Sequence, residues 1–428
     1  MDAQVIVVGG GLSGLIAARA LQRRGVDVMV LEAAGRLGGR ALSETSTLGS
    51  RLDLGGQWIG HDHHRLAALV DELGATRYPM TTGPLPAIVS GGRRLSLASP
   101  TVLTAVAALA GVEALGRVGR SERWNATTLE SWLSKVPGRT ARRLLEVIAL
   151  ISWTVDLDRF SVHAMVRMIR SQGGLTTALA TRGGAQDELV VEGIGTLVDR
   201  LADELGPRVR TGCRVVELVR DQGGVTVRTD TDELRAAKVI VTVPPPMAAR
   251  ITHGPELPAD RTELEATTYM GSVYKAVAVY ERPFWRDRGR GEFLLLDGPG
   301  SAVFDTTAPD GPGHLCFLVG GPQARELDAL DADARRAAML APLEPLLGAQ
   351  LLTPAGWHEK FWHTDEFAGG GYFAAPEPGT TAGLPPMSSV PVGHVHWAGS
   401  ETAADHPGYL DGAIESGERA AAEVSTTL

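Results

Sequence analysis

The chain has 428 residues, with 41 lysines and arginines against 50 aspartates and glutamates, and therefore a net charge of −9. This acidic balance argues against nucleic-acid binding, which needs a basic surface. Two cysteines, Cys213 and Cys316, are too few for a disulfide framework, so we expect reduced thiols and a cytoplasmic protein.

The first 32 residues predict a buried strand (5–8), a glycine turn, a helix and a second strand that ends at Glu32. Gly9, Gly11 and Gly14 form the pattern G-x-G-x-x-G between the first strand and the helix, which is the context of a dinucleotide-binding turn. Gly9 permits the tight turn, Gly11 lets a pyrophosphate approach the backbone, and Gly14 lets the helix pack on the strand. We expect Glu32 to accept hydrogen bonds from a ribose and to disfavour the extra phosphate of NADP.

Two more glycine pairs follow, at residues 38–39 and 55–56. They indicate backbone that wraps closely around an extended ligand. Arg40, next to the first pair, can hold a phosphate through two parallel hydrogen bonds. NAD needs only the first βαβ unit and its neighbour, so these additional contacts favour FAD.

Residues 61–64, "HDHH", contain three histidines, but no cysteine or acidic cluster nearby completes a set of metal ligands. We therefore predict no metal, and we expect Asp62 to cap the helix that follows. The longest apolar run, residues 101–118, is interrupted by Glu113 and predicts a buried or surface-docked helix, not a membrane anchor. The residues after Met1 show no signal peptide.

Residues 273–280 predict a strand whose side chains alternate between two faces, with Lys275 on the same face as Val273 and Val277. A lysine on an apolar face is costly unless it is paired or solvated. The residues alone leave two interpretations open: an edge strand from which Lys275 reaches water, or a buried lysine with a function.

Five segments together resemble, in order, the flavin-dependent amine oxidases, the monoamine oxidase group: "EAAGRLGGR", "DLGGQWIG", "GSVYKAVAVYERPFW", "GGGYF" and "WAGSETAADHPGYLDGAIESGERAA". The resemblance implies an α/β fold with a Rossmann-like FAD-binding domain from residues 1–80, 190–270 and 365–428. A discontinuous substrate domain of mixed sheet plus helices would come from residues 81–189 and 271–364. The implied reaction is oxidation of an amine to an imine by hydride transfer to flavin N5. Oxygen would be reduced to hydrogen peroxide, and the imine would hydrolyse to an aldehyde or ketone.

The resemblance also implies site residues. Tyr372 and Tyr409 would form an aromatic cage that orients a neutral amine, and Lys275 would hold a water near N5 and assist the reaction with oxygen. The helix that begins near Leu410 would direct its N-terminus at the pyrimidine side of the flavin. The other residues expected at the flavin are Ser13, Ala33, Gly56, Gln57, Trp58, Val215, Trp362, Gly399, Ser400 and Glu401. Leu179 and Gln186 are expected in the substrate pocket.

Two positions depart from the family's pattern. Gly371 stands where mammalian relatives carry a cysteine bonded to the flavin, so we expect non-covalent FAD. His406 and Pro407 stand where an aromatic residue is expected before Gly408, and they leave the size and class of the amine open.

Three other functions remain open at this point. One is a flavin dehydrogenase that acts on an N-heterocyclic amine and passes electrons to a protein. Another is an L-amino-acid oxidase, which would need an arginine for the substrate carboxylate. The third is a flavin-binding regulator without turnover. The sequence also leaves a homodimer open.

Overall fold

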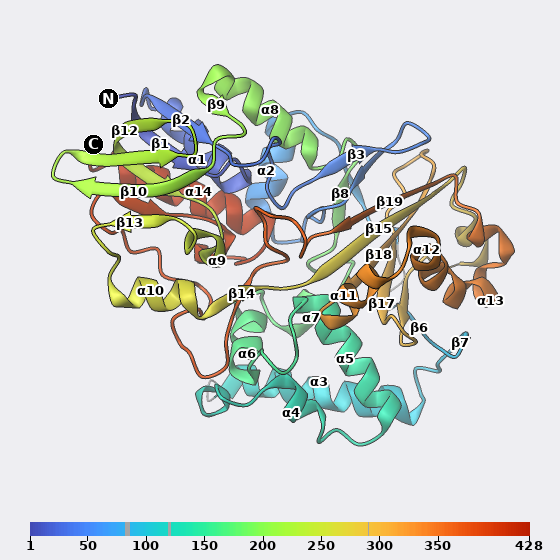
Figure 1. The fold of residues 1–428 in the computed structure, drawn as a ribbon. Helices are drawn as coiled ribbons and strands as arrows, with labels where there is room; N and C mark the ends of the chain where they lie inside the picture. The colour runs from blue at the N-terminus through green and yellow to red at the C-terminus, as the bar shows by residue number, and fades with distance from the viewer. Residues whose placement is uncertain (82–85, 119–120, 290) are drawn as a thin grey trace.

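The computed structural model describes residues 1–81, 86–118, 121–289 and 291–428 (Figure 1). Within these residues the strands form two large sheets, one of eight strands and one of seven, and several two-stranded pairs. Figure 1 shows the two large sheets in separate lobes, with both termini in the first lobe and a group of helices beneath the second. The predicted mixed α/β class is confirmed.

The first sheet contains the predicted dinucleotide-binding strand. β1 (Ala3–Val8) runs parallel to β2 (Val28–Leu31) on one side and to β12 (Glu233–Val241) on the other. Both faces of β1 are covered, which explains its continuous apolar run. The remaining strands of this sheet are β9 (Val209–Arg210), β10 (Val215–Asp221), β11 (Gly224–Thr229), β13 (Thr252–Gly254) and β21 (Val395–Trp397).

One face of this sheet is covered by helices from the beginning, middle and end of the chain: α1 (Leu12–Gln22), α2 (His64–Glu72), α8 (Gly195–Leu205) and α14 (Leu410–Ser425). α14 packs directly on α1, because Gly417 has no side chain there. A Cβ at Gly417 would lie 2.4 Å from the carbonyl oxygen of Ser13. The C-terminal helix therefore returns to the dinucleotide-binding strand, as predicted.

The second sheet has β15 (Val273–Tyr280) in its interior, between β18 (Gly313–Gly320) and β19 (Gly356–Phe361). The edge-strand interpretation of Lys275 is therefore wrong. The predicted alternation is confirmed, because Tyr274 and Ala276 pack on one face while Val277 packs on the other. The sheet continues through β17 (Ser301–Asp305), β16 (Phe293–Leu295), β6 (Ala87–Ser90) and β7 (Arg93–Arg94). The helices on the Tyr274 face are α11 (Pro322–Glu326), α12 (Ala332–Leu340) and α13 (Glu344–Leu347).

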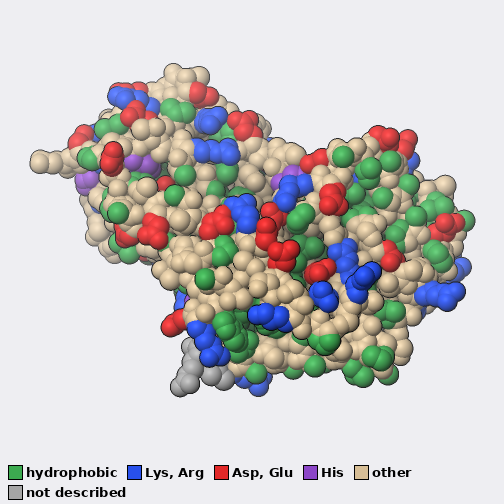
Figure 2. Space-filling model, turned by 60° about the horizontal axis from the view of Figure 1, so that its bottom comes forward, with side chains coloured by type: hydrophobic (Ala, Val, Ile, Leu, Met, Phe, Trp, Pro, Cys, Tyr) green, Lys and Arg blue, Asp and Glu red, His purple; other side chains and the backbone are tan. Residues whose placement is uncertain are grey.

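The opposite side of this lobe carries the helices α3 (Pro100–Val118), α4 (Leu129–Leu133), α5 (Arg139–Trp153), α6 (Val162–Ser171) and α7 (Leu175–Leu179). α3 is the expected surface-docked helix: Leu103 is 57% exposed, while Val102 and Ala105 are buried. None of the described helices is long and apolar enough to cross a bilayer. Figure 2 turns this underside toward the viewer and shows hydrophobic side chains interspersed with basic and acidic ones.

The remaining short helices and strands are β3 (Ser43–Thr45), β4 (Arg51–Asp53), β5 (Arg77–Pro79), β8 (Glu188–Val190), α9 (Pro245–Ala248), α10 (Ala259–Ala266), β14 (Thr268–Met270) and β20 (Ala374–Pro376). The strands of the first large sheet all fall within 1–80, 190–270 and 365–428, and those of the second within 81–189 and 271–364. This distribution is what the predicted division into two domains requires. The domain boundaries themselves remain a prediction.

Candidate functional site

A cavity of about 570 Å³ extends from the ends of β1 and β2 to the inner side of α3. Near β1 it is lined by glycines and polar groups, and near α3 by apolar side chains such as Leu109, Ile148 and Ile151. All the site residues expected from the sequence line this cavity, except Gly14 and Glu401. The fold thus brings residues 9–58, 179–186, 275, 362–372 and 399–410 to one place.

The glycine turn after β1 has the geometry of a phosphate cradle. A Cβ at Gly14 would lie 2.0 Å from the carbonyl oxygen of Gly9, so Gly14 is needed for helix packing behind the cavity wall. Around Gly11 the nearest atom to such a Cβ, the carbonyl oxygen of Gly38, is 3.9 Å away, so a side chain would project into the cavity. Gly11 is also the N-cap of α1 and places no side chain on the helix's first N–H groups, which remain available to an anion.

Glu32 is held at the end of β2 by two backbone groups. Its carboxylate accepts hydrogen bonds from the N–H groups of Gly10 and Ala34, both at 2.7 Å. The side chain is buried but lines the cavity, so its remaining lone pairs can accept hydrogen bonds from the two hydroxyls of a ribose. Together with the open space at Gly11, this geometry fits the adenosine diphosphate part of a dinucleotide.

Arg40 forms a different ion pair from the one expected. Its Nη1 and Nη2 donate to the two carboxylate oxygens of Glu401 at 2.6 and 3.0 Å, and Nη1 also donates to the carbonyl oxygen of Tyr372 at 2.7 Å. The prediction that Arg40 holds a phosphate through two parallel hydrogen bonds is therefore wrong for these two nitrogens. Burial alone would raise the pKa of Glu401, but the Arg40 charge lowers it. A buried carboxylate needs such a partner, and the pair joins three distant segments at the cavity wall.

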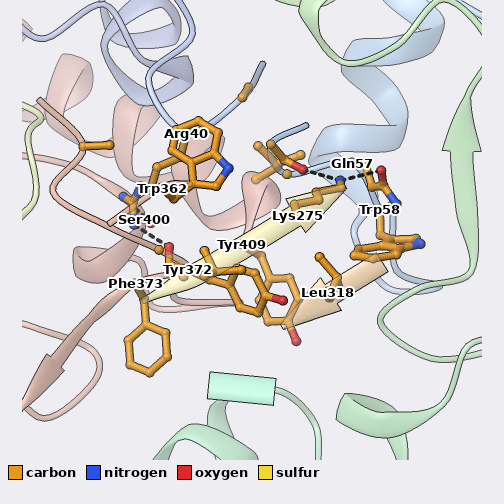
Figure 3. A pocket seen from close by; sticks show the side chains of 18 of the residues that line it. Arg40, Gln57, Trp58, Lys275, Leu318, Trp362, Tyr372, Phe373, Ser400 and Tyr409 are labelled. Atoms are coloured by element: carbon orange, nitrogen blue, oxygen red, sulfur yellow. Dashed lines mark hydrogen bonds between the residues drawn. The ribbon is translucent and has the colours of Figure 1, made fainter. Parts of the chain in front are cut away.

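Tyr372 and Tyr409 come from separate loops, and both rings point into the cavity (Figure 3). The N–H of Tyr372 donates to Thr154 Oγ1 at 2.9 Å, and Thr154 ends α5 in a left-handed conformation. Tyr409 is the N-cap of α14 without a side-chain cap bond, so its ring is free to extend away from the helix. Burial raises the pKa of both phenols, which therefore stay protonated at ordinary pH.

Gly408 precedes Tyr409, the N-cap of α14, and shapes the loop that carries the Tyr409 ring. Its φ is +86°, a conformation that side chains rarely adopt, and a Cβ there would lie 3.3 Å from Cβ of Phe373. The glycine therefore lets the Tyr409 loop approach the Tyr372 loop closely.

Lys275 extends from β15 into the cavity and is 3% exposed. Its Nζ donates to the carbonyl oxygen of Gly55 at 2.8 Å and to Gln57 Oε1 at 2.6 Å (Figure 3). Burial lowers the pKa of Lys275, although Cys316 and Asp53 nearby oppose this effect. Two acceptors satisfy two of the three N–H bonds of an ammonium, so the third can hold a water in the cavity.

The other expected residues surround this centre. Trp362 is buried, and its Nε1 donates to the carbonyl oxygen of Leu54 at 2.8 Å. The ring of Trp58 packs edge-on against Phe304, with the centroids 5.1 Å apart. Sequence reasoning did not find Phe304 or Thr154, because neither belongs to a motif. Their positions follow from the pairing of β17 and the length of α5.

The prediction that Asp62 caps α2 is wrong. His63 is the N-cap of this helix, without a side-chain cap bond, and the Asp62 carboxylate instead lies 3.1 Å from His406 Nε2. Asp62, His63 and His406 each offer an atom that could bind a metal, all within 4.8 Å of one another. Residues 61–64 contain two members of this cluster, but their sequence does not reveal the third, because His406 comes from the far end of the chain.

A family model described as flavin containing amine oxidoreductase matches residues 12–425 of the chain. The chain belongs to this family. The family uses FAD, and the turn at Gly11, the Glu32 carboxylate and the long cavity are consistent with an FAD molecule in this amine oxidoreductase. The assigned roles of individual residues remain predictions.

Several relatives match this amine oxidoreductase over almost its whole length. AofH of Mycobacterium tuberculosis, provisionally named a flavin-containing monoamine oxidase, is 34% identical over 99% of this chain and 97% of its own. An L-amino acid dehydrogenase of Synechocystis is 32% identical over 97% of this chain and 93% of its own. Among solved structures, cyclohexylamine oxidase from Brevibacterium oxydans has a TM-score of 0.95 at 29% identity, with 100% of this chain and 99% of the other covered.

Proposed function

We propose that this amine oxidoreductase oxidises an amine to an imine, with oxygen as the electron acceptor and hydrogen peroxide as the second product. The observation that carries the proposal is the placement of Tyr372, Tyr409 and Lys275 in the same cavity as the dinucleotide-binding turn. The imine would then hydrolyse in water to an aldehyde or ketone. A bound FAD would supply the redox chemistry, which is the two-electron oxidation of the amine coupled to the two-electron reduction of oxygen to hydrogen peroxide.

The residues of the chain bind and orient the amine. The two phenol rings offer flat faces between which an uncharged amine can lie with its α C–H directed at the cofactor. Because their pKa values are raised, the phenols are neutral and do not compete as bases for the amine's protons. Apolar side chains such as Leu318 and Ile151 line the adjoining cavity and exclude water from it.

The cavity favours an amine without a carboxylate. Among the described residues that line it, the arginines are Arg36, Arg40, Arg214 and Arg250, and all of them come from segments of the nucleotide-binding lobe. Arg40 is already paired with Glu401. An amino-acid oxidase would need an arginine near the two tyrosines to hold the substrate carboxylate through two parallel hydrogen bonds. The cation that does line the cavity with the tyrosines, Lys275, already donates to Gly55 and Gln57.

We expect purified protein to release hydrogen peroxide with 2-phenylethylamine and at least about tenfold less with L-phenylalanine, because burying an unpaired carboxylate is costly. These two compounds differ by the carboxylate alone. A coupled peroxidase assay in air measures the product, and a dye acceptor without oxygen tests for a dehydrogenase. Peroxide from the amino acid would make the enzyme an amino-acid oxidase, and turnover with the dye only would make it a dehydrogenase.

We also expect FAD to be released when the protein is denatured with acid. Gly371 has no side chain that could bond to the flavin, and a Cβ there would lie 3.2 Å from Val273 Cγ1. After precipitation, the yellow absorbance should stay in the supernatant. Flavin that remained in the precipitate would show that another residue binds it covalently.

We further propose that the protein works in the cytoplasm. Cys213 and Cys316 are both free thiols, and Cys316 is fully buried in the second sheet. Free thiols suit a reducing compartment.

A further inference from the structure

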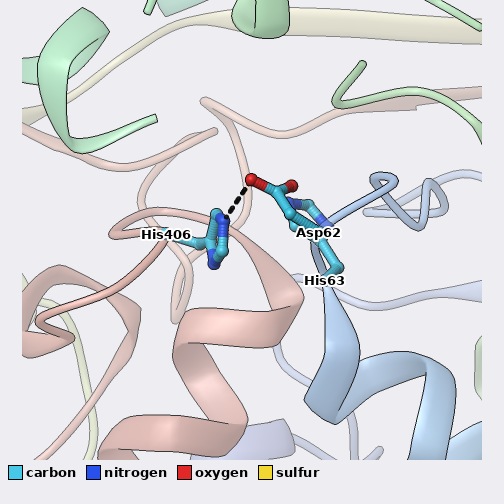
Figure 4. Close-up of side chains that lie close together, drawn as sticks. All are labelled: Asp62, His63 and His406. Atoms are coloured by element: carbon cyan, nitrogen blue, oxygen red, sulfur yellow. Dashed lines mark ion pairs between the residues drawn. The ribbon is translucent and has the colours of Figure 1, made fainter. Parts of the chain in front are cut away.

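His406 lies between two carboxylates, one in the loop before α2 and the other in α14. Its Nε2 is 3.1 Å from Asp62 Oδ2, in the loop before α2 (Figure 4). Its Nδ1 is 3.4 Å from Asp411 Oδ2, in the first turn of α14. Asp411 is 1% exposed, and its other oxygen accepts the N–H of Leu66 in α2 at 2.8 Å. The cluster therefore links the beginnings of two helices that pack on one another.

Either a metal ion or a proton could occupy this cluster, and the geometry favours the proton. His63 Nδ1 accepts the N–H of Gly60 at 2.8 Å, so Nε2 carries the proton of a neutral ring and has no lone pair for a metal. Both nitrogens of His406 face a carboxylate, which suits an imidazolium that donates in both directions.

We propose that His406 is a positioning residue: as an imidazolium between Asp62 and Asp411, it fixes the turn that carries Tyr409, so that amine binding depends on its protonation. The inference rests on the proposed role of Tyr409 in the substrate cavity.

Three contacts connect the bridge to Tyr409. The carbonyl oxygen of His406 accepts the N–H of Tyr409 at 3.1 Å. The ring of His63 packs edge-on against both His406 and Tyr409, with centroid distances of 4.7 and 4.9 Å. A Cβ at Gly412 would lie 2.3 Å from the His406 carbonyl oxygen, so the turn rests directly on the first turn of α14. A shift of His406 would therefore move the phenol ring.

The backbone conformation of His406 also indicates that its side chain is held in place. Its φ is +51°, a left-handed conformation that is unfavourable for a residue with a side chain. Two carboxylates that hold the ring can offset this cost, and without them the turn should relax.

The charged groups around His406 set the direction of its pH dependence. Burial lowers the pKa of His406, but the hydrogen bonds to Asp411 and Asp62 outweigh this effect and raise it. Burial and the His406 charge lower the pKa of His63 to about 4, so His63 stays neutral. His61 lies 3.6 Å from Asp62 but is exposed. The bridge therefore contributes its full stability below the ordinary histidine pKa and loses it as pH rises through the raised value.

The test compares His406→Gln, which keeps a polar side chain without a titratable proton, with wild type across pH. The control is His64→Gln, an exposed histidine of the same tract. At each pH the wild-type value of kcat/KM is divided by that of the variant. The fraction of neutral amine is the same for both proteins, so its effect on kcat/KM cancels in this ratio. For His406→Gln this ratio should be about tenfold at about pH 6, mainly through KM, and should fall toward one at about pH 9. For the control it should stay near one throughout.

Thermal unfolding gives a readout that needs no turnover. The wild type should melt above His406→Gln at about pH 6, and the difference should shrink by about pH 9. A pH-independent difference in melting temperature, or a zinc or nickel ion bound at one per chain, would overturn the bridge. A pH-dependent difference in melting with an unchanged KM would overturn its link to Tyr409. If the wild type oxidises no amine, the proposed function fails, while the melting curves still decide whether the bridge exists.

Discussion

Replacing Tyr409 by alanine is expected to lower kcat/KM for amines about 100-fold, because a substrate that loses one wall of its binding site no longer holds its reacting bond in line. FAD should stay bound at the wild-type level, since the dinucleotide turn and Glu32 lie at the other end of the cavity. Peroxide release measures the loss. The ratio of flavin to protein absorbance shows whether the cofactor is retained.

Tyr409→Phe is the matched control. The ring is kept and only the hydroxyl is removed, so activity should stay within about threefold of wild type if the aromatic face is what matters. The raised pKa of Tyr409 supports this expectation, because a phenol that stays protonated does not act as a base at ordinary pH. An alanine variant with unchanged kcat/KM for several amines would refute the aromatic cage. A phenylalanine variant as poor as alanine would instead assign the role to the hydroxyl.

The features predicted well from the sequence depend on local constraints. Gly9 has a φ of +109°, and Gly14 packs against the backbone of Gly9 five residues earlier, so the glycine pattern between a strand and a helix identified the turn between β1 and α1. The alternation along β15 identified its two faces, because side chains of a strand point alternately to opposite sides. The resemblance to a family then placed Tyr372 and Tyr409 together, which no local pattern in either segment indicates.

The features that were missed depend on pairs of residues far apart in the chain. Arg40 pairs with Glu401, and Asp62 pairs with His406, so in both cases the partner could not be read from neighbouring residues. Local rules offered an alternative for each: a phosphate for Arg40 and a helix cap for Asp62. A buried or half-buried charge takes the strongest partner that the fold brings to it, and only the folded chain shows which one that is.

Replacing Lys275 by methionine is expected to slow the reaction of the reduced enzyme with oxygen about 100-fold, while reduction by the amine changes much less. A positive group favours electron transfer to oxygen because negative charge develops there, and losing one such preorganised group typically costs this much. Stopped-flow mixing of anaerobically reduced enzyme with oxygenated buffer measures the first rate. Mixing of oxidised enzyme with amine measures the second.

The pH dependence should distinguish a charge effect from a packing effect. Burial lowers the pKa of Lys275, so the wild-type reoxidation rate should fall as pH rises through a value below that of an ordinary lysine, and the methionine variant should show no such fall. Lys135→Met is the control, because Lys135 is an exposed lysine that does not belong to the cavity lining. If Lys275→Met slowed reduction and reoxidation equally, its effect would come from the lost hydrogen bonds to Gly55 and Gln57 and the resulting change in the shape of the site. Lys275 would then have no specific role toward oxygen.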